Sequence, residues 1–326
     1  MSVQTPYEEK EKLTIKESRE LLDTLIDETL NEEITNIDYR EGKSVRNSVF
    51  RVQTKHHGNM IVRLSDSEEA LDRYEKEAWC MGSVSELDVP VPKVVAAGNT
   101  VIPYAYSILE ELPGISADQY VDTKKKAIEI WHKIGRFVRI IHKIDTKGFG
   151  LFFNWKSKHD SGFNDWRDYL NGYDIRIDRV IDIYENVMKF DKKKLEKIEY
   201  FIEKIKNWYV YPKLNHFDIG LRNVLINSDG AISGILDWEM ARSLPAPYGD
   251  FAQVYMELLL KGEKESLDAF IKGYGFSKEN FERIKEDAEA YTIIRMSNHL
   301  NYLNEVEAKG EIRKHKKVLA NLSIFS

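Results

Sequence analysis

The stretch Leu214–Asp237, LNHFDIGLRNVLINSDGAISGILD, decides how the rest of the chain is interpreted. Two short apolar runs rich in β-branched residues, Val224–Ile226 and Ile232–Leu236, flank the turn NSDG and predict a β-hairpin. Asn223 then precedes the first strand, and Asp237 follows the second. Because a hairpin brings those two ends together, we expect an amide oxygen and a carboxylate within reach of one hard cation.

The same stretch has the spacing of a phosphotransferase catalytic loop. In kinases that loop reads H-x-D-x-x-x-x-N, in which the Asp takes up the acceptor hydroxyl, the Asn holds a metal ion, and a downstream Asp completes the metal site. His216, Asp218 and Asn223 match this frame, and Asp237 matches the downstream Asp. An isolated match arises often by chance, so the hairpin and the upstream features support the prediction. We expect His216 to brace the loop as a buried imidazole.

Length and composition bound the class of protein. The chain has 326 residues, of which 42% are hydrophobic and 31% charged, and this suits one large or two ordinary globular domains with a full core. The formal net charge of -6 argues against a nucleic-acid-binding protein, which needs a basic surface. A cationic partner is weakly favoured, although a merely soluble surface accounts for this charge more simply.

The number of cysteines and the lack of long apolar runs indicate the cellular compartment in which the protein works. Cys80 is the only cysteine, so no intrachain disulfide can form and a reducing compartment is expected. Charged residues at Glu8–Lys12 make the N-terminus unlike a signal peptide. No stretch approaches the roughly 20 apolar residues of a membrane span. We expect a cytoplasmic protein, monomeric, with no membrane or nucleic-acid partner.

The first third of the sequence predicts a small sheet domain that follows an amphipathic helix at Thr14–Leu30. Short apolar runs with β-branched residues, separated by turn residues, indicate its strands. We expect strands at 34–39, 48–54, 60–64, 94–97 and 104–110, and a helix at 68–85. The sequence EELPG at Glu110–Gly114 breaks both composition and period, and we interpret it as the hinge between two lobes.

Five residues of this domain are candidates for nucleotide binding. Arg63 lies on a predicted strand, and its planar guanidinium can meet two phosphate oxygens at once. Glu77 on the following helix is the acid that we expect to pair with Arg63, as the Lys–Glu pair does in kinases. Ser44 lies in the connection that would cover the phosphates, although a connection with one glycine is more typical of an ordinary turn. Backbone groups of Glu110 and Leu112 are expected to meet an adenine edge.

The rest of the chain predicts helices and a candidate acceptor site. Apolar residues at helical spacing indicate a helix around 127–141, ending near Gly148, and another around 195–208, N-capped by Asp191. The insertion Phe149–Asp174 combines aromatic and acidic residues, which either floor a pocket for a cationic, hydroxylated molecule or pack on the core. The candidate substrate contacts are Asp165, Trp166, Trp238, Glu239, Arg295 and His299.

Helices are also predicted at the C-terminal end. Asp250 in the string YGDFA begins a helix that runs to Leu260, where its carboxylate fits as a helix cap and as a brace for the catalytic loop. Helical periodicity then predicts helices at 263–273, 278–306 and 311–322.

The strings HFDIGLRNVLI, GILDWEMA and PYGDFA closely resemble the aminoglycoside phosphotransferase family, whose usual strings read HGDLHPGN, IDW and D-L-A. The resemblance extends over most of the chain, through Val62–Leu64, Leu112–Gly114 and the strings GFGLF and WRDY. Within the family, the chain looks most like the hygromycin B phosphotransferase branch. The chain departs from the family pattern at Phe217, which replaces a small residue, and at Ile219–Arg222, which replaces L-H-P-G.

This resemblance implies an α+β, bilobal protein-kinase-like fold, with a small N-terminal antiparallel-sheet lobe at 1–112 and a larger, mostly helical C-terminal lobe at 113–326. It implies ATP and Mg²⁺, with GTP left open as a donor. We expect transfer of the γ-phosphoryl group to a hydroxyl of an aminoglycoside-like, hygromycin-like antibiotic, with Asp218 as catalytic residue and Asn223 and Asp237 as metal ligands. Two alternatives stay open. One is a kinase of a small metabolite of the choline, homoserine, methylthioribose or macrolide type, and the other is a non-catalytic kinase-like binding protein.

Overall fold

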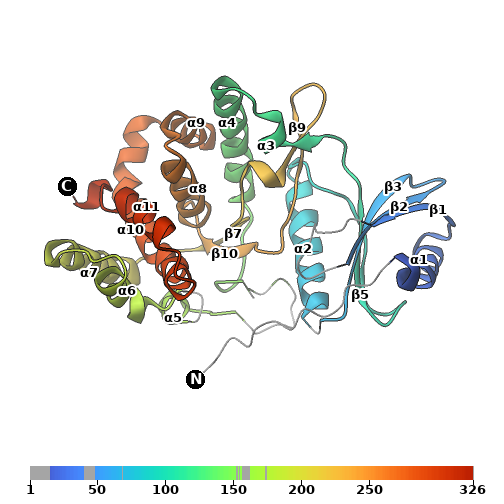
Figure 1. The fold of residues 1–326 in the computed structure, drawn as a ribbon, viewed down its shortest axis with the longest axis horizontal. Coiled ribbons are helices and arrows are strands. Elements are labelled where there is room, and N and C mark those ends of the chain that lie inside the picture. The colour runs from blue at the N-terminus through green and yellow to red at the C-terminus, as the bar shows by residue number, and fades with distance from the viewer. Residues whose placement is uncertain are drawn as a thin grey trace. The chain divides into compact units, whose positions relative to one another are not determined.

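The computed structural model describes residues 15–39, 48–67, 69–151, 153, 155, 162–172 and 175–325. These residues form two compact units. One takes its residues from Met1–Gly82 and Pro92–Leu112, and the other from Ser83–Val91 and Pro113–Ser326. An antiparallel sheet dominates the first unit and helices dominate the second, which confirms the predicted α+β fold class (Figure 1). Within the described residues, no helix is long and apolar enough to cross a membrane.

The first unit is built on a five-stranded sheet in the order β1-β2-β3-β5-β4, in which every neighbouring pair is antiparallel. Its elements are α1 (Ile15–Leu30), β1 (Ile34–Tyr39), β2 (Ser48–Thr54), β3 (Asn59–Ser65), α2 (Ala70–Ser85), β4 (Val94–Gly98) and β5 (Ala105–Glu110). The strands agree with the predicted ranges to within one residue at each end, because turn residues mark their limits clearly.

The two faces of this sheet pack against different helices, because successive strand residues point to opposite faces. One face packs against α1, and the two form a core of Leu22, Leu25, Ile26, Phe50, Val52, Met60, Val62, Leu64 and Ile108. On the other face, Arg63 lies directly opposite Ser107, and Ala105 packs against Tyr74 of α2. The sheet and α2 therefore enclose the Arg63 side chain.

The second unit is mostly helical and holds two small sheets, β10-β7 and β6-β8-β9. Its helices are α3 (Ala117–Tyr120), α4 (Lys124–Ile141), α5 (Trp166–Asn171), α6 (Val180–Asn186), α7 (Lys192–Lys206), α8 (Tyr248–Lys261), α9 (Lys264–Tyr274), α10 (Lys278–Glu305) and α11 (Lys309–Leu319). Its strands are β6 (Ile115–Ser116), β7 (Pro212–Asn215), β8 (Val224–Ile226), β9 (Ile232–Ile235) and β10 (Arg242–Pro245). Short 3₁₀ helices lie at Ile177–Arg179, Leu221–Asn223 and Ser323–Phe325.

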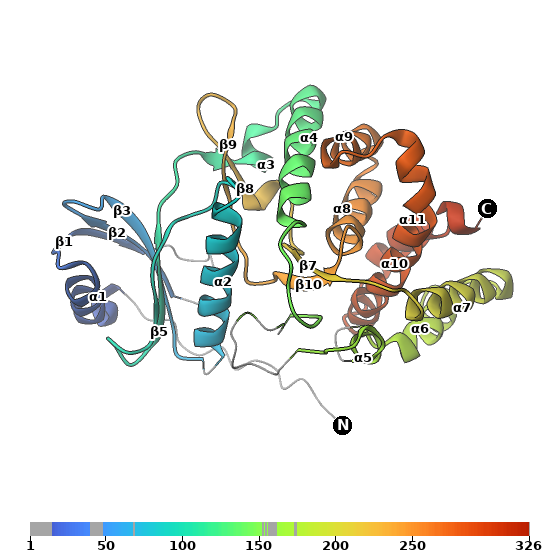
Figure 2. The same ribbon diagram turned by 180° about the vertical axis from the view of Figure 1, so that it is seen from behind.

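Helices α4 and α9 lie side by side in this unit, as both views show (Figures 1 and 2). Gly135 of α4 lies so close to the carbonyl oxygen of Phe270 that a Cβ at position 135 would overlap that oxygen. Gly273 of α9 approaches the carbonyl of His132 in the same way. The approach of the two backbones therefore requires glycine at both positions.

The predicted hairpin is present as β8 and β9, with Val224 opposite Ile235. Asp191 caps α7, as predicted, by accepting the N–H of Lys194. One predicted boundary is wrong, because the helix expected to end near Gly148 ends at Ile141. The residues that follow it run beside β7, where Leu214 donates its N–H to the carbonyl of Ile144 at 3.0 Å.

Candidate active site

Strands β7 and β10 fix the point at which the loop His216–Asn223 begins. Asn215, the last residue of β7, lies opposite Arg242 of β10 and is fully buried. Its amide donates to the carbonyl of Leu244 at 3.1 Å, and its Oδ1 accepts the N–H of Asp250 at 3.1 Å. Asn215 therefore ties both strands to the start of α8. Our sequence analysis missed this role, because a single Asn before the H-x-D string follows no pattern of its own.

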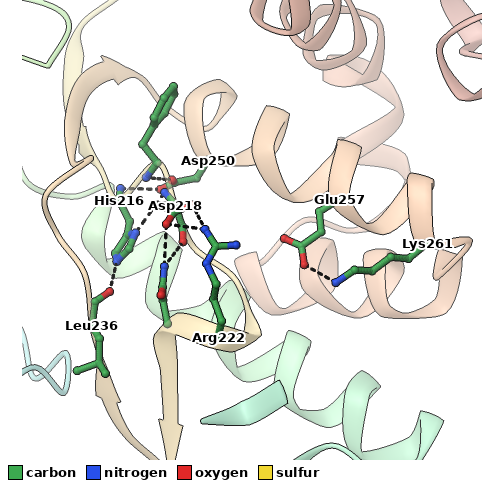
Figure 3. A network of polar contacts seen from close by, with 9 residues as sticks. His216, Asp218, Arg222, Leu236, Asp250, Glu257 and Lys261 are labelled. Carbon is green, nitrogen blue, oxygen red and sulfur yellow. Dashed lines mark hydrogen bonds and ion pairs between the residues drawn. The ribbon is translucent and has the colours of Figure 1, made fainter. Parts of the chain in front are cut away.

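Asp250 is a fully buried carboxylate that holds the beginning of the loop (Figure 3). Its Oδ2 accepts the N–H of His216 at 3.1 Å, its Oδ1 accepts the N–H of Phe217 at 2.6 Å, and Nε2 of His142 lies 3.0 Å from Oδ2. Burial alone would raise the pKa of Asp250, but the hydrogen bond and charge of His142, with further donors, lower it. Because α8 begins at Tyr248 after its N-cap Pro247, Asp250 lies in the first turn and does not cap the helix.

His216 is fully buried and uses both ring nitrogens. Nδ1 accepts the N–H of Asp218 at 3.3 Å, so Nε2 is the protonated nitrogen, and it donates to the carbonyl of Leu236 at 2.9 Å. Burial lowers the pKa of His216 and outweighs the opposing charge of Asp250. A neutral His216 thus joins the loop to the end of the hairpin.

Phe217 has a φ of 67°, an uncommon value for a residue with a bulky side chain. Its backbone is fixed by Asp250, and its ring is 3% exposed. The guanidinium groups of Arg295 and Arg242 lie over the ring, 3.7 Å and 4.3 Å from its centroid. These contacts are cation–π interactions, and they hold the aromatic ring at the position where the chain departs from the family pattern quoted above.

Asp218 presents a carboxylate whose side chain is 18% exposed. The amide of Asn223 donates to the backbone oxygen of Asp218 at 2.8 Å and to its Oδ2 at 2.9 Å. Nη2 of Arg222 donates to Oδ1 at 2.5 Å and to Oδ2 at 2.7 Å (Figure 3). The loop therefore closes on itself through side chains four and five positions apart.

Asp237 lies at the end of the hairpin, two residues after β9, with an exposed side chain and a φ of 64°. Leu236 donates its N–H to the carbonyl of Asn223 at 2.8 Å. This bond places Asp237, the next residue, beside Asn223, as the hairpin argument predicts. Because Asn223 gives its amide N–H groups to Asp218, its Oδ1 is the atom suited to a cation.

The donor atoms present fit a magnesium–nucleotide complex rather than an all-protein metal cage. Among the described residues, no group of three or more His, Cys, Asp or Glu side chains could hold a metal ion. Mg²⁺ commonly takes one or two side-chain oxygens and completes its shell with phosphate oxygens and water. Asn223 and Asp237 are the two residues that could supply such a pair.

In the first unit, Arg63 and Glu77 form the predicted ion pair. Nη1 of Arg63 donates to Oε1 at 3.2 Å and Nη2 donates to Oε2 at 2.9 Å, while Nη2 also donates to Ser107 at 3.2 Å. The side chains are 14% and 3% exposed, and the guanidinium also lies 4.8 Å from the centroid of the Tyr74 ring. Two parallel hydrogen bonds with little exposure fix the direction of Arg63.

The structure gives less information on the other three residues that we predicted to bind nucleotide. Glu110 donates its N–H to the carbonyl of Lys93 at 2.9 Å, so this N–H is not available to an adenine. Leu112 is the last residue of the first unit. Ser44 lies outside the described residues.

The residues predicted to contact substrate fall in several places. Asp165 caps α5, where it accepts the N–H groups of Arg167 and Asp168. Trp166 and Trp238 are 5% and 0% exposed, and their indole N–H groups donate to the carbonyls of Ile205 and Ile235. Of the remaining three, Glu239 is half-buried, Arg295 lies on the Phe217 ring, and His299 is exposed, with its ring 5.2 Å from that of His315.

A cavity of about 410 Å³ opens in the second unit, at the end of the β7–β10 pair away from the loop. It is lined by Trp208, Tyr209, Val210, Tyr211, Lys213, Pro245, Ala246, Tyr248 and Asp287. None of the predicted substrate residues lines it, although Trp166 stacks on Trp208 with 6.2 Å between ring centroids. We assign it no role.

Comparison with known structures finds this fold in antibiotic phosphotransferases. A thermostable mutant of aminoglycoside phosphotransferase APH(4)-Ia, solved with AMP-PNP and hygromycin B, is 16% identical with a TM-score of 0.59, covering 92% of this chain and 99% of that chain. Macrolide 2'-phosphotransferase MphH from Brachybacterium faecium is 16% identical with a TM-score of 0.56, covering 93% and 98%. APH(2")-IIa in complex with gentamicin is 17% identical with a TM-score of 0.57, covering 97% and 99%. At these identities the shared property is the fold.

The sequence itself decides the family. No curated protein matches the chain. A family model described as "Phosphotransferase enzyme family" matches residues 40–286, which is most of the chain and includes the whole loop and hairpin. The chain therefore belongs to the phosphotransferase enzyme family.

Proposed function

We propose that this phosphotransferase moves the γ-phosphoryl group of ATP to a hydroxyl of a small molecule and that Asp218 orients that hydroxyl. The observation that carries the proposal is the position of the Asp218 carboxylate. It is partly exposed, it is anchored by Asn223, and it stands on a loop whose first residues are held by buried Asp250. A carboxylate held in this way can accept a hydrogen bond from an incoming hydroxyl without reorganising.

The proposed step is an in-line displacement at the γ-phosphorus. The acceptor oxygen forms the new bond to phosphorus, and the bond from phosphorus to the bridging oxygen breaks. ADP leaves with that electron pair, and the hydroxyl proton passes to the carboxylate of Asp218. Because the transferring group has a loose transition state, most of the acceleration comes from positioning and electrostatic stabilisation.

Asn223 and Asp237 would hold Mg²⁺, one through Oδ1 and the other through its carboxylate. The bound ion would offset negative charge on the phosphates during transfer. In the first unit, Arg63, directed by Glu77, would bind α- and β-phosphate oxygens. Ser44, the carbonyl of Glu110 and the backbone of Leu112 remain the proposed contacts to the rest of the nucleotide.

We propose an aminoglycoside-like, hygromycin-like antibiotic as the acceptor. One observation supports a cationic, hydroxylated molecule. The structural neighbours include enzymes solved with hygromycin B and with gentamicin. Trp166 and Trp238 are not proposed as contacts, because they are buried and their N–H groups are bonded.

A macrolide is the second candidate acceptor. Macrolide phosphotransferases are also among the structural neighbours. A kinase of a small metabolite is the alternative to an antibiotic kinase.

The deciding experiment measures ADP release from Mg-ATP, and from Mg-GTP, with a panel of acceptors. The panel contains hygromycin B and other aminoglycosides, macrolides, choline, homoserine and methylthioribose. Stimulation by an aminocyclitol compound that disappears in Asp218→Asn would establish the antibiotic kinase. Undiminished turnover in Asp218→Asn would overturn the role of Asp218. Stimulation by a metabolite alone would reassign the acceptor.

A further inference from the structure

Arg222 is bound to the proposed catalytic carboxylate by a contact that the spacing of the loop did not predict. Its Nη2 donates to both oxygens of Asp218, at 2.5 Å and 2.7 Å (Figure 3). Within the described part of the chain, Nη2 is the nitrogen of Arg222 that makes hydrogen bonds, and the side chain is 61% exposed. The contact with Asp218 therefore involves one of the three guanidinium nitrogens of Arg222.

No other side chain between Asp218 and Asn223 can donate a hydrogen bond to this carboxylate. The intervening residues are Ile219, Gly220 and Leu221, none of which has a polar side chain. The side-chain amide of Asn223 contacts Oδ2 of Asp218 and therefore holds one of the two carboxylate oxygens. Arg222 contacts Oδ1 as well, so both oxygens of the carboxylate are held.

The guanidinium of Arg222 is cationic, because an arginine side chain is not deprotonated in proteins. Glu257 bonds Lys261 at 2.7 Å and makes no hydrogen bond to Arg222 (Figure 3). Asp218 is therefore the carboxylate that holds Arg222.

We propose that Arg222 is a positioning residue for phosphoryl transfer. It fixes the carboxylate of Asp218 in the orientation that the acceptor hydroxyl needs, and its positive charge offsets the repulsion between that carboxylate and the incoming γ-phosphoryl group. Both effects act on the transfer step and not on nucleotide binding by the first unit. The inference rests on the proposed function, since it assigns Arg222 a part in the same reaction.

The test compares Arg222→Ala with Lys261→Ala, which removes an equal charge from the same neighbourhood but from a side chain that does not contact Asp218. We expect kcat to fall about 100-fold in Arg222→Ala, while the KM for ATP stays within about threefold. Lys261→Ala should keep the wild-type kcat. Guanidinium ion at tens of millimolar should restore part of the lost kcat in Arg222→Ala, and sodium ion at the same ionic strength should not.

Crystal structures of the two variants give a readout that does not depend on turnover. The Asp218 carboxylate should lose its single orientation in Arg222→Ala and keep it in Lys261→Ala. An unchanged Asp218 in Arg222→Ala, a kcat equal to that of wild type, or a loss confined to the KM for ATP would each overturn the inference. If wild-type protein and Lys261→Ala both fail to transfer phosphate to any acceptor, the proposed function fails instead. The structures still decide whether Arg222 orients Asp218.

Discussion

Asp250 and Phe217 lie 33 positions apart in the chain, yet the N–H of Phe217 donates to Oδ1 of Asp250 at 2.6 Å. The same carboxylate holds His216 and contacts His142, so one buried charge fixes the first two residues of the loop. Because Phe217 has a φ of 67°, its conformation depends on such tertiary contacts and not on local preference. The geometry of the proposed catalytic loop is therefore imposed from α8.

Replacing Asp250 with Ala should destabilise the protein strongly. The change leaves the N–H groups of His216 and Phe217 and the ring of His142 without their shared buried acceptor. We expect the free energy of unfolding to fall by about 3–5 kcal/mol, as measured by urea denaturation. Asp268→Ala, at an exposed site on α9, is the matched control and should change stability by less than about 0.5 kcal/mol. Similar losses in both variants would contradict the buried network.

Replacing Arg63 with Lys should weaken ATP binding although the charge is kept. A lysine cannot make two parallel hydrogen bonds to Glu77, so its ammonium group would not be directed toward the phosphates. We expect the Kd for Mg-ATP, measured by calorimetry, to rise about tenfold, which corresponds to about 1.4 kcal/mol. Arg19→Lys, in an exposed pair with Asp23 on α1, should bind ATP like wild type. An unchanged Kd in Arg63→Lys would remove this side chain from the nucleotide site.

Replacing Asp237 with Ala should abolish the magnesium dependence of nucleotide binding. Asn223 would then be the only proposed side-chain ligand, and one amide oxygen holds Mg²⁺ poorly. Titrations of ATP with and without Mg²⁺ should give the same weak affinity in this variant. Asp229→Ala, in the turn at the other end of the hairpin, should keep the wild-type difference. A magnesium effect that persists in Asp237→Ala would count against the metal role.

Acid should destabilise the folded protein partly through His216. The pKa of His216 is lowered by burial, so below the ordinary histidine value of about 6.5 the unfolded chain binds a proton that the folded chain resists. The stability due to neutral His216 is therefore complete above about pH 6.5 and is lost as the pH falls through the lowered folded value. Urea denaturation between pH 8 and 5 should show a steeper decline in wild type than in His216→Gln. Parallel declines would contradict a buried neutral imidazole.

Replacing Gly135 with Ala should separate α4 from α9. The new Cβ would overlap the carbonyl oxygen of Phe270, a backbone atom that cannot move without shifting the helix. We expect a loss of about 3 kcal/mol or more of unfolding free energy, because overpacking is costly in a close-packed core. Gly82→Ala is the matched control in helix α2, since nothing lies within 4 Å of its Cβ position. This control should gain up to about 1 kcal/mol from helix propensity. A tolerated Gly135→Ala would show that the helices are not packed this closely.

The sequence by itself determined the features that depend on short separations. The hairpin, the placement of Asn223 beside Asp237, and the strands of the first unit follow from alternating apolar residues and turn residues. The pairing of Arg63 with Glu77 was also predictable, because the motif relates a strand to the helix that follows it. The residue at which α4 ends could not be predicted in this way. The residues after α4 pair with β7, and this pairing joins positions about 70 residues apart.

Only the tertiary structure decided which side chains meet across the fold. Asn215 and Asp250 hold the start of the loop through hydrogen bonds. Arg295 lies on the ring of Phe217, and Trp238 is buried against His216. Local sequence cannot specify these contacts, because the direction of a polar side chain depends on the charges and packing that distant segments bring to it, and each contact forms only once the chain has folded.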